Sequence, residues 1–261
     1  MSVTVNQIAE EIEKIAPLSL MEEWDNSGLQ LRVKDSVKKV LVALEINDDV
    51  IDEAIANKCD MILTHHPLIF YPEKSVDIKN ITGNYICRLV KNNISVYSSH
   101  TPFDICKGGN NDYLAKLLGL NGIKPLNGDN SSITRMGKLR DEMRLGDFVN
   151  FAIEKVGTSK AFVKLTGHPE RKIKKIGLCT GAGCEFIDLA VQNKCDLFIT
   201  GDLKYHDAVN AKANGIAVLD LGHYGTEYLF KENIISLLEN KKDIPKLIMS
   251  KVDGNPFVDF V

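Results

Sequence analysis

Histidine and carboxylate side chains recur where predicted strands end, and together they offer the ligands of a metal centre. The set that we single out comprises His65, His66, Asp104, His223 and Glu227. Divalent ions such as Zn²⁺ bind imidazole nitrogen and carboxylate oxygen together. A carboxylate has two oxygens and can bridge a pair of ions about 3.5–4 Å apart, the arrangement that two-metal hydrolytic sites use. The residue types therefore predict a centre that holds two divalent ions.

The adjacent histidines His65 and His66 stand at the end of an apolar segment, in the sequence "LTHHPLIF" (63–70). Neighbouring side chains on a strand point to opposite faces, so we expect the two imidazoles to serve different partners, one metal ion each. A lone histidine at a strand end is more often a hydrogen-bonded polar residue than a metal ligand. The pair, together with the histidines of two later loops, favours the metal site.

The elements that position these residues occur twice in the chain. Residues 37–70 align without a gap to residues 173–206, with ten of 34 positions identical, including the whole of "NKCD". Each copy predicts a strand, a short loop, a helix and a second strand, which ends in "LTHH" in one copy and "ITGD" in the other. A β-α-β unit of this kind implies parallel strands joined by a right-handed crossover.

A second similarity follows at nearly the same offset. The segment "NNISVYSSHTPFD" (92–104) resembles "ANGIAVLDLGHYGTE" (213–227), and both predict a strand followed by a loop with a histidine and, four residues later, an acid. We therefore predict an α/β fold of two duplicated α/β domains, with mainly parallel sheets flanked by helices. The predicted domains span residues 1–126 and 127–261, with "NGDNSS" (127–132) as the linker and the metal site between them.

The composition is that of an ordinary globular protein, with 44% hydrophobic and 26% charged residues. The net charge of −3 gives no basic excess, so we expect no nucleic-acid partner. The N-terminal segment predicts an amphipathic helix rather than a signal peptide, and no apolar run reaches the roughly 20 residues of a membrane span. Six cysteines without a CxxC pair favour reduced thiols. These features predict a cytoplasmic protein with no membrane partner.

Five motifs, in order along the chain, carry a resemblance to a known family. They are "WDNSGLQL" (24–31), "LTHHPLIF" (63–70), "SSHTPFD" (98–104), "TGDLKYHDA" (200–208) and "LGHYGTE" (221–227). The ordered set resembles the GTP cyclohydrolase I type 2 homologues, also called Nif-three-like proteins, a family with a dinuclear metal centre. The similarity covers nearly the whole chain and fits the short form of the family, without the domain that longer members insert between the halves.

The resemblance implies which residues would hold each ion. His65 and Asp104 would hold the first ion, His66 and His223 the second, and Glu227 would bridge both. The resemblance also implies a homohexameric ring whose sites face an inner cavity. The identity of the two ions per subunit stays open among Zn, Mn, Fe, Co and Ni, because sets of imidazole and carboxylate ligands accept all of them.

Several functions remain open for such a site. The first is a metal-dependent hydrolase, for which the resemblance suggests GTP as the small-molecule substrate, with opening of the purine ring and release of formate. A metal-dependent phosphatase or phosphodiesterase would use the same ligands on a phosphoester. A non-catalytic oligomer that stores metal or binds a regulatory partner, and a metal-free nucleotide site, are alternatives from other classes. A surplus of polar groups that are not implied ligands favours an enzyme, namely Asp25, His100, Asp202 and His206.

Three of the remaining motifs have more than one interpretation. His100 is a candidate catalytic acid or base, a hydrogen-bond donor that orients Asp104, or a residue that makes a merely structural hydrogen bond. Asp25 and Asn26 in "WDNSG" either line the site or simply form a turn. The glycine-rich "TGAGC" (180–184) predicts a tight turn between strand and helix, with contact to a substrate phosphate as the alternative.

Four further residues receive simpler predictions. Asp202 and His206 follow the second-repeat strand, and their roles stay open because this segment departs from the histidine-rich version of some family members. We expect His168 to lie on the surface, in a polar turn. Cys179 and Cys184 are expected to pack rather than to react.

Overall fold

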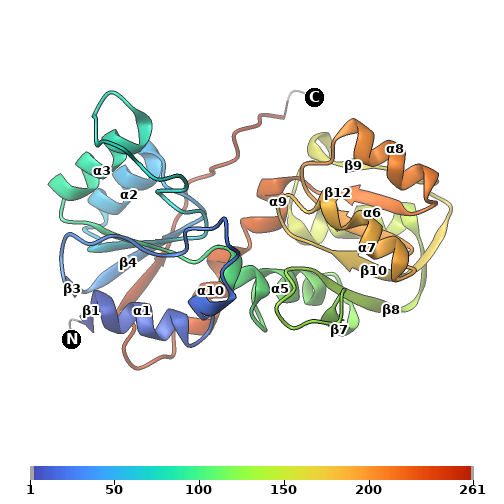
Figure 1. The fold of residues 1–261 in the computed structure, drawn as a ribbon, viewed down its shortest axis with the longest axis horizontal. Coiled ribbons are helices and arrows are strands. Elements are labelled where there is room, and N and C mark those ends of the chain that lie inside the picture. Colours follow the sequence, from blue (N-terminus) through green and yellow to red (C-terminus); the bar gives the residue numbers. More distant parts are fainter. Residues whose placement is uncertain (1–2, 260–261) are drawn as a thin grey trace. The chain divides into compact units, whose positions relative to one another are not determined.

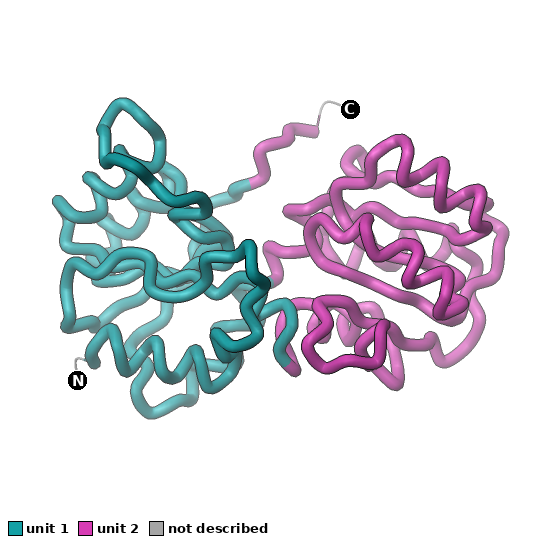
Figure 2. Tube along the Cα trace, viewed as in Figure 1, with its two compact units in different colours: residues 1–106, 230–254 teal, residues 107–229, 255–261 magenta. Residues whose placement is uncertain are grey.

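The structure of the protein, a computed structural model, describes residues 3–259 (Figure 1). The chain divides into two compact units, which Figure 2 colours separately. Unit 1 comprises Met1–Cys106 and Phe230–Gly254, and unit 2 comprises Lys107–Leu229 and Asn255–Val261. Each unit has its own sheet and its own helices.

Unit 1 is built on a five-stranded sheet in the order β13-β4-β5-β6-β2. Its strands are β2 (Gly28–Leu31), β4 (Lys39–Ala43), β5 (Met61–Thr64), β6 (Ser95–Ser98) and β13 (Lys246–Met249). The strands from β13 to β6 are parallel, and β2 is antiparallel to β6. Strands β5 and β6 are buried along their whole length, as expected for parallel strands covered on both faces. A short antiparallel pair, β1 (Val3–Thr4) and β3 (Ser36–Val37), lies outside this sheet.

Helices of unit 1 contribute to two separate core clusters. The helices of unit 1 are α1 (Val5–Glu13), η1 (Leu18–Leu20), α2 (Asp48–Ala56), α3 (Ile81–Lys91), α4 (Thr101–Ile105) and α10 (Phe230–Leu238). One cluster joins α1 and α10 to the sheet, and the other joins α2 and α3 to it. The amphipathic N-terminal helix is confirmed as α1, which buries Ile8 and Ile12 and begins with a capping box between Thr4 and Gln7.

Unit 2 is built on a six-stranded sheet in the order β7-β8-β10-β11-β12-β9. Its strands are β7 (Asn121–Pro125), β8 (Arg135–Arg144), β9 (Lys164–Leu165), β10 (Lys172–Leu178), β11 (Leu197–Thr200) and β12 (Ala217–Asp220). The central strands β10, β11 and β12 are parallel, and antiparallel strands flank them on both sides. Its helices are α5 (Asn110–Leu117), α6 (Leu145–Val156), η2 (Lys160–Phe162), η3 (Cys184–Phe186), α7 (Ile187–Gln192), α8 (Tyr205–Ala213) and α9 (His223–Glu227). The predicted α/β fold with parallel sheet segments and flanking helices is confirmed.

The sequence repeat corresponds to a structural repeat. Strands β4, β5 and β6 are adjacent and parallel in unit 1, as β10, β11 and β12 are in unit 2. The shared "NKCD" forms the turn from the helix to the second strand, and its lysines, Lys58 and Lys194, have φ angles of 54° and 55°. One carboxylate oxygen of Asp60, and likewise of Asp196, accepts hydrogen bonds from two successive backbone N–H groups. The four residues that are identical in the two units therefore form the same turn with the same hydrogen bonds.

The compact units differ from the predicted division at residues 126 and 127. The segment that contains α5 and β7 belongs to unit 2, because β7 pairs with β8. The segment 127–132 is the connection between these two strands rather than a linker between units. Helix α10 and strand β13 return to unit 1, where β13 pairs with β4 and α10 packs into the core. The predicted boundary follows the repeat, and none of these four elements is part of the repeat.

Two observations concern the chain as a whole. No helix within residues 3–259 is long and apolar enough to cross a membrane. The six cysteines are free thiols, as their spacing predicts. Burial raises the pKa of Cys59 and of Cys195 to about 11. These two thiols, which occupy equivalent positions in the repeat, therefore pack as apolar side chains.

Candidate metal centre

The adjacent histidines follow β5 directly, and hydrogen bonds fix their backbone. The N–H groups of His65 and His66 both donate to the Leu44 carbonyl, at N···O distances of 3.0 and 2.9 Å. The Thr64 hydroxyl donates to the His66 carbonyl at 2.8 Å. The turn lies at the carboxyl end of parallel strands, the edge at which open α/β sheets bind their ligands.

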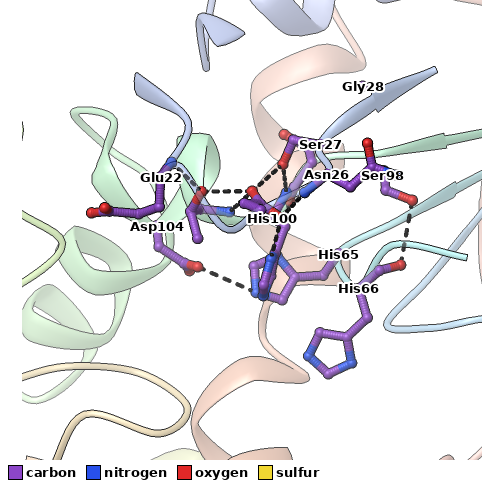
Figure 3. Close-up of polar contacts among 12 residues, drawn as sticks. Glu22, Asn26, Ser27, Gly28, His65, His66, Ser98, His100 and Asp104 are labelled. Carbon is purple, nitrogen blue, oxygen red and sulfur yellow. Dashed lines mark hydrogen bonds and ion pairs between the residues drawn. The ribbon is translucent and has the colours of Figure 1, made fainter. Parts of the chain in front are cut away.

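The imidazoles of His65 and His66 lie side by side (Figure 3). Their ring centroids are 5.3 Å apart, with an angle of 37° between the ring planes. The alternation expected of strand residues does not extend to them, because β5 ends at Thr64 and both histidines belong to the turn beyond it. Their acidic neighbours nevertheless differ, since His65 faces Asp104 and His66 faces Glu45.

His65 and Asp104 form a buried pair. The Nδ1 atom of His65 lies 2.9 Å from the Ser99 carbonyl oxygen, which can only accept, so Nδ1 carries the proton. The opposite ring nitrogen, Nε2, faces Asp104, whose Oδ2 is 3.5 Å away. Bonds of about 2.1 Å from one ion to both atoms would meet at roughly 110°, close to the tetrahedral value. The donor set and its spacing thus fit a divalent ion.

His66 and His100 extend this group within unit 1. His65, His66 and His100 each offer a ring nitrogen, and the three atoms lie within 4.8 Å of one another. The His100 ring is 5.1 Å from the His65 ring and 5.7 Å from the His66 ring, in edge-to-face geometry with both. His66 is partly exposed, and its Nδ1 lies 3.4 Å from a carboxylate oxygen of Glu45. The predicted catalytic residue therefore lies beside two of the predicted ligands.

Asp25 holds His100 in place from the "WDNSG" loop. One carboxylate oxygen of Asp25 lies 2.8 Å from Nδ1 of His100. The other accepts hydrogen bonds from the hydroxyl groups of Ser27 and Thr101, at 2.7 and 2.6 Å. Burial opposes ionisation of Asp25, but the hydrogen bond and charge of His100 and the two hydroxyl bonds outweigh it and lower its pKa. Asp25 is thus an ionised carboxylate that orients the imidazole.

The rest of the loop connects His100 to the segment after the histidine pair. The side-chain amide of Asn26 donates to the Ile69 carbonyl at 2.6 Å. Trp24 lies 5.7 Å from the His100 ring and 6.1 Å from the Phe70 ring. Of the two interpretations of "WDNSG", the structure therefore supports a role beside the site as well as a turn. Ser27, which also accepts from the His100 backbone N–H at 3.0 Å, was not singled out from the sequence.

The predicted ligands of unit 2, His223 and Glu227, form a second pair on one helix. They lie four residues apart on α9, which follows β12, and their Nε2 and Oε2 atoms are 2.9 Å apart. Nδ1 of His223 lies 2.8 Å from a carboxylate oxygen of Asp202. Metal-ligating histidines are commonly oriented in this way, by a carboxylate that holds the ring nitrogen opposite to the one that binds the ion. Asp202 thereby gains a role that the sequence left open.

The glycine-rich "TGAGC" segment makes room for Glu227. Gly181 has a φ of +65°, and a Cβ atom there would lie 2.1 Å from a Glu227 carboxylate oxygen. Its backbone N–H donates to the Thr226 hydroxyl at 2.9 Å. The segment is the turn between β10 and η3, as predicted, and a side chain at Gly181 would displace the predicted bridging carboxylate.

The other residues considered from the sequence lie apart from these groups. His206 is exposed on α8, where its ring packs against the neighbouring Tyr205. His168 is exposed, as predicted. Cys179 is buried, and burial raises the pKa of Cys184 to about 11, so both thiols are poorly suited to react. Three of the five predicted ligands thus belong to unit 1, and two belong to unit 2.

The fold and these groups define a class: an α/β protein with a duplicated parallel sheet and candidate metal-binding histidines and carboxylates at its strand ends. Comparison with known proteins identifies the family. The model of the Duf34/NIF3 (NGG1p interacting factor 3) family matches residues 3–256, and the chain belongs to this family.

Individual relatives agree with this assignment. The chain is 34% identical over 260 residues to the GTP cyclohydrolase 1 type 2 homolog of Clostridium perfringens, covering 97% of this chain and 98% of the relative. It is 34% identical over 234 residues to the protein of the same name from Clostridium acetobutylicum, covering 87% of each. Among solved structures, the Staphylococcus aureus hypothetical protein SA1388 matches with a TM-score of 0.92 and 29% identity. That match covers 99% of this chain and 100% of SA1388.

Proposed function

We propose that the protein is a hydrolase that depends on two divalent metal ions, with GTP as its substrate. The observation that supports it most directly is the pairing of an imidazole Nε2 with a carboxylate in each unit, while Nδ1 of the same ring is held by a second acceptor. This arrangement brings an imidazole nitrogen and a carboxylate oxygen together, the two donor types that divalent metal sites combine, with the ring oriented from its other nitrogen. The name shared by the relatives suggests the GTP reaction, in which the purine ring opens and formate leaves.

In this proposal the two groups together complete one centre. His65 and Asp104 would hold one ion and His66 and His223 the other, and Glu227 would be the ligand shared by both. When bound, the ions would polarise the substrate and lower the pKa of a water molecule that attacks it. His100 carries a proton between that water and the leaving group, and Asp25 keeps its ring oriented for the transfer.

Metal content is the first test of the proposal. We expect about two ions per chain by elemental mass spectrometry of untagged protein, and one or fewer in Glu227→Gln. Glu154→Gln, on an exposed position of α6, is the matched control and keeps the wild-type content. Wild-type protein that binds no metal after incubation with Mn, Fe or Zn contradicts the dinuclear centre.

Turnover is the second test. Metal-loaded protein should release formate from GTP, and His66→Ala should lower the rate by about 100-fold or more. His206→Ala, an exposed histidine outside both groups, should leave the rate unchanged. Release of phosphate or alcohol from phosphoester probes, without formate from GTP, would instead identify a phosphatase or phosphodiesterase. Metal binding without any turnover would favour a storage or scaffold role.

The homohexamer stays a prediction that one feature of unit 1 supports. Between β5 and α3 and at the start of α3, three large apolar side chains are exposed: Tyr71 by 76%, Ile78 by 68% and Ile81 by 72%. Exposed apolar side chains that lie close together in the chain are typical of an interface with another subunit. Light scattering coupled to size-exclusion chromatography would show the mass, and a monomer would exclude the ring.

A further inference from the structure

Unit 2 contains a cavity that borders the proposed metal ligand His223 and extends to residues that the proposed centre does not use. Its volume is about 250 Å³, and its lining includes Phe162, Lys164, Asp202, His223, Tyr224 and Phe257. This volume is below the roughly 300–1,000 Å³ of sites for drug-sized ligands. It suits one ring system of a ligand, whose other groups would extend from the mouth.

Two neighbouring aromatic rings belong to the cavity lining. Phe162 is in η2, and Phe257 belongs to the C-terminal segment, with ring centroids 6.3 Å apart and an angle of 44° between the planes. The C-terminal segment is attached to the same region by a hydrogen bond from the Ser159 hydroxyl to Asp259. Phe257 is nonetheless 68% exposed. A planar ring bound here would cover apolar surface that now faces solvent.

The polar lining offers one acceptor and one donor. Asp202 accepts from His223 with Oδ2, and no other described residue bonds to its carboxylate, so Oδ1 remains available. The Lys164 ammonium donates to the Leu203 carbonyl and to Asp220, at 3.1 and 3.0 Å, which leaves its third N–H available. Asp220 also accepts from two backbone N–H groups and is buried, so it acts as an anchor for the lysine rather than as a ligand contact.

Asp202 has an uncommon backbone conformation. Its φ of +56° lies in the left-handed region, which non-glycine residues adopt uncommonly, and aspartate and asparagine more readily than most. Such conformations occur often at ligand sites, where surrounding contacts hold them. In this conformation the Asp202 carboxylate reaches His223 and also lines the cavity.

We propose that this cavity binds the planar heterocycle of the substrate and selects rings whose edge presents both an N–H donor and a carbonyl acceptor, as guanine does. Asp202 accepts from the ring N–H or amino group, Lys164 donates to the carbonyl, and Phe162 and Phe257 contact the ring face. That the bound ring belongs to a substrate which is then hydrolysed rests on the proposed function. Binding of the ring itself requires none of the metal ligands of unit 1.

Calorimetric titration of EDTA-treated full-length protein with guanosine and adenosine tests the proposal. We expect guanosine to bind with a Kd of about 0.1–1 mM and adenosine about fivefold or more weakly, because adenine has no carbonyl on that edge. Phe257→Ala should weaken guanosine binding about fivefold. Val258→Ala, the neighbouring position at 82% exposure and outside the lining, is the matched control and should bind as wild type. Asp202→Asn, which tolerates the same φ, should lose most of the preference for guanosine.

Each other outcome has a definite meaning. No detectable heat with guanosine at millimolar concentration, or equal affinity in Phe257→Ala and Val258→Ala, overturns the site. Equal binding of guanosine and adenosine by wild-type protein overturns the selection by the polar edge. Guanosine binding as expected, in a protein that holds no metal and releases no formate, would leave the cavity assigned and refute the proposed hydrolase. GTP turnover with an unchanged KM in Phe257→Ala would support the proposed hydrolase and refute the assignment of the cavity.

Discussion

The ends of β5 in unit 1 and β11 in unit 2 occupy equivalent positions in the repeat but carry different residues. His65 corresponds to Gly201, and His66 corresponds to Asp202. A Cβ atom at Gly201 would lie 2.6 Å from the backbone nitrogen of His223, so no histidine fits there. In unit 1 the equivalent space accommodates an imidazole that bonds to the Ser99 carbonyl. The close approach of the loop after β12 thus excludes an imidazole at the position in unit 2 that corresponds to His65.

The histidines that follow the third parallel strand make a second comparison. His100 and His223 each have Nδ1 2.8 Å from an aspartate oxygen. The aspartate of unit 1, Asp25, has a fully buried side chain, whereas the side chain of Asp202 is 51% exposed. A buried, multiply bonded carboxylate fixes a ring more firmly than an exposed one. The comparison supports a positioning role for Asp25 and a ligand-contacting role for Asp202.

The largest loss of stability is expected for Gly201→Ala, which tests whether the strand end of unit 2 has room for a side chain. The added methyl group meets the backbone of residues 222–223, and neither strand end nor helix start can move freely. We expect the free energy of unfolding to fall by about 3 kcal/mol or more in urea titration. Gly146→Ala is the control, because its nearest neighbour would be a Pro169 side-chain carbon at 3.3 Å and it lies in α6. A Gly201→Ala protein as stable as the control would show that the backbone there yields.

An intermediate effect is expected from removing each aspartate charge in the second comparison. In Asp25→Asn, an amide replaces the carboxylate that accepts from the buried hydroxyl groups and from the His100 imidazole. An amide nitrogen cannot accept, so we expect the free energy of unfolding to fall by about 2 kcal/mol. Asp202→Asn should change it by less than about 0.5 kcal/mol, because the carboxylate is half exposed. Urea titration of both variants measures the difference. Equal losses would mean that burial does not distinguish the two histidine–aspartate pairs.

A smaller effect than that of Asp25→Asn, about 1 kcal/mol, is expected for Asp60→Asn in the turn that both units share. Burial opposes ionisation of Asp60, but hydrogen bonds from Lys34 and two backbone N–H groups lower its pKa. A lowered pKa contributes stability above the unfolded value of about 3.9, and that contribution is lost as the pH falls through the folded value. The difference between wild type and Asp60→Asn should therefore be present at pH 7 and shrink below about pH 4.

Asp196→Asn sharpens the same comparison. Asp196 accepts the equivalent backbone bonds from Lys174 and Lys175. Within residues 3–259, no lysine side chain pairs with Asp196 as Lys34 pairs with Asp60. Its loss of stability at pH 7 should be smaller than that of Asp60→Asn, in the same urea titration. A larger loss would mean that the backbone bonds, rather than Lys34, dominate this turn.

The strand ends and their residues were predictable from sequence because the repeat has a visible pattern. The alignment placed β5 and β11 at matching positions, and the histidines and acids after each strand could be read directly. The pairing of Asp25 with His100 joins residues 75 positions apart, so no local pattern could predict it. The side-by-side arrangement of His65 and His66 depends on where β5 ends, which is set by the bonds to Leu44.

The division into units was less predictable for a similar reason. A repeat in the sequence indicates which segments share a structure, but not where the remaining elements pack. Strand β13 is a short apolar segment of four residues, and its place beside β4 depends on an edge that other parts of the chain leave open. The burial of Phe230 against the His65 ring, at 5.1 Å between centroids, has no sequence signal either.

The return of α10 and β13 to unit 1 has a consequence for synthesis of the chain. The sheet of unit 1 cannot be completed until Lys246–Met249 have been synthesised, because these residues pair with the edge of β4. Some 200 residues lie between these two strands. At a rate of synthesis of about 5–20 residues per second, roughly 10–40 s pass between the completion of β4 and that of β13. Unit 2, by contrast, has its whole sheet in one continuous stretch between β7 and β12. The nascent protein therefore carries an open β-strand edge that a chaperone, or another nascent copy, can reach during that interval.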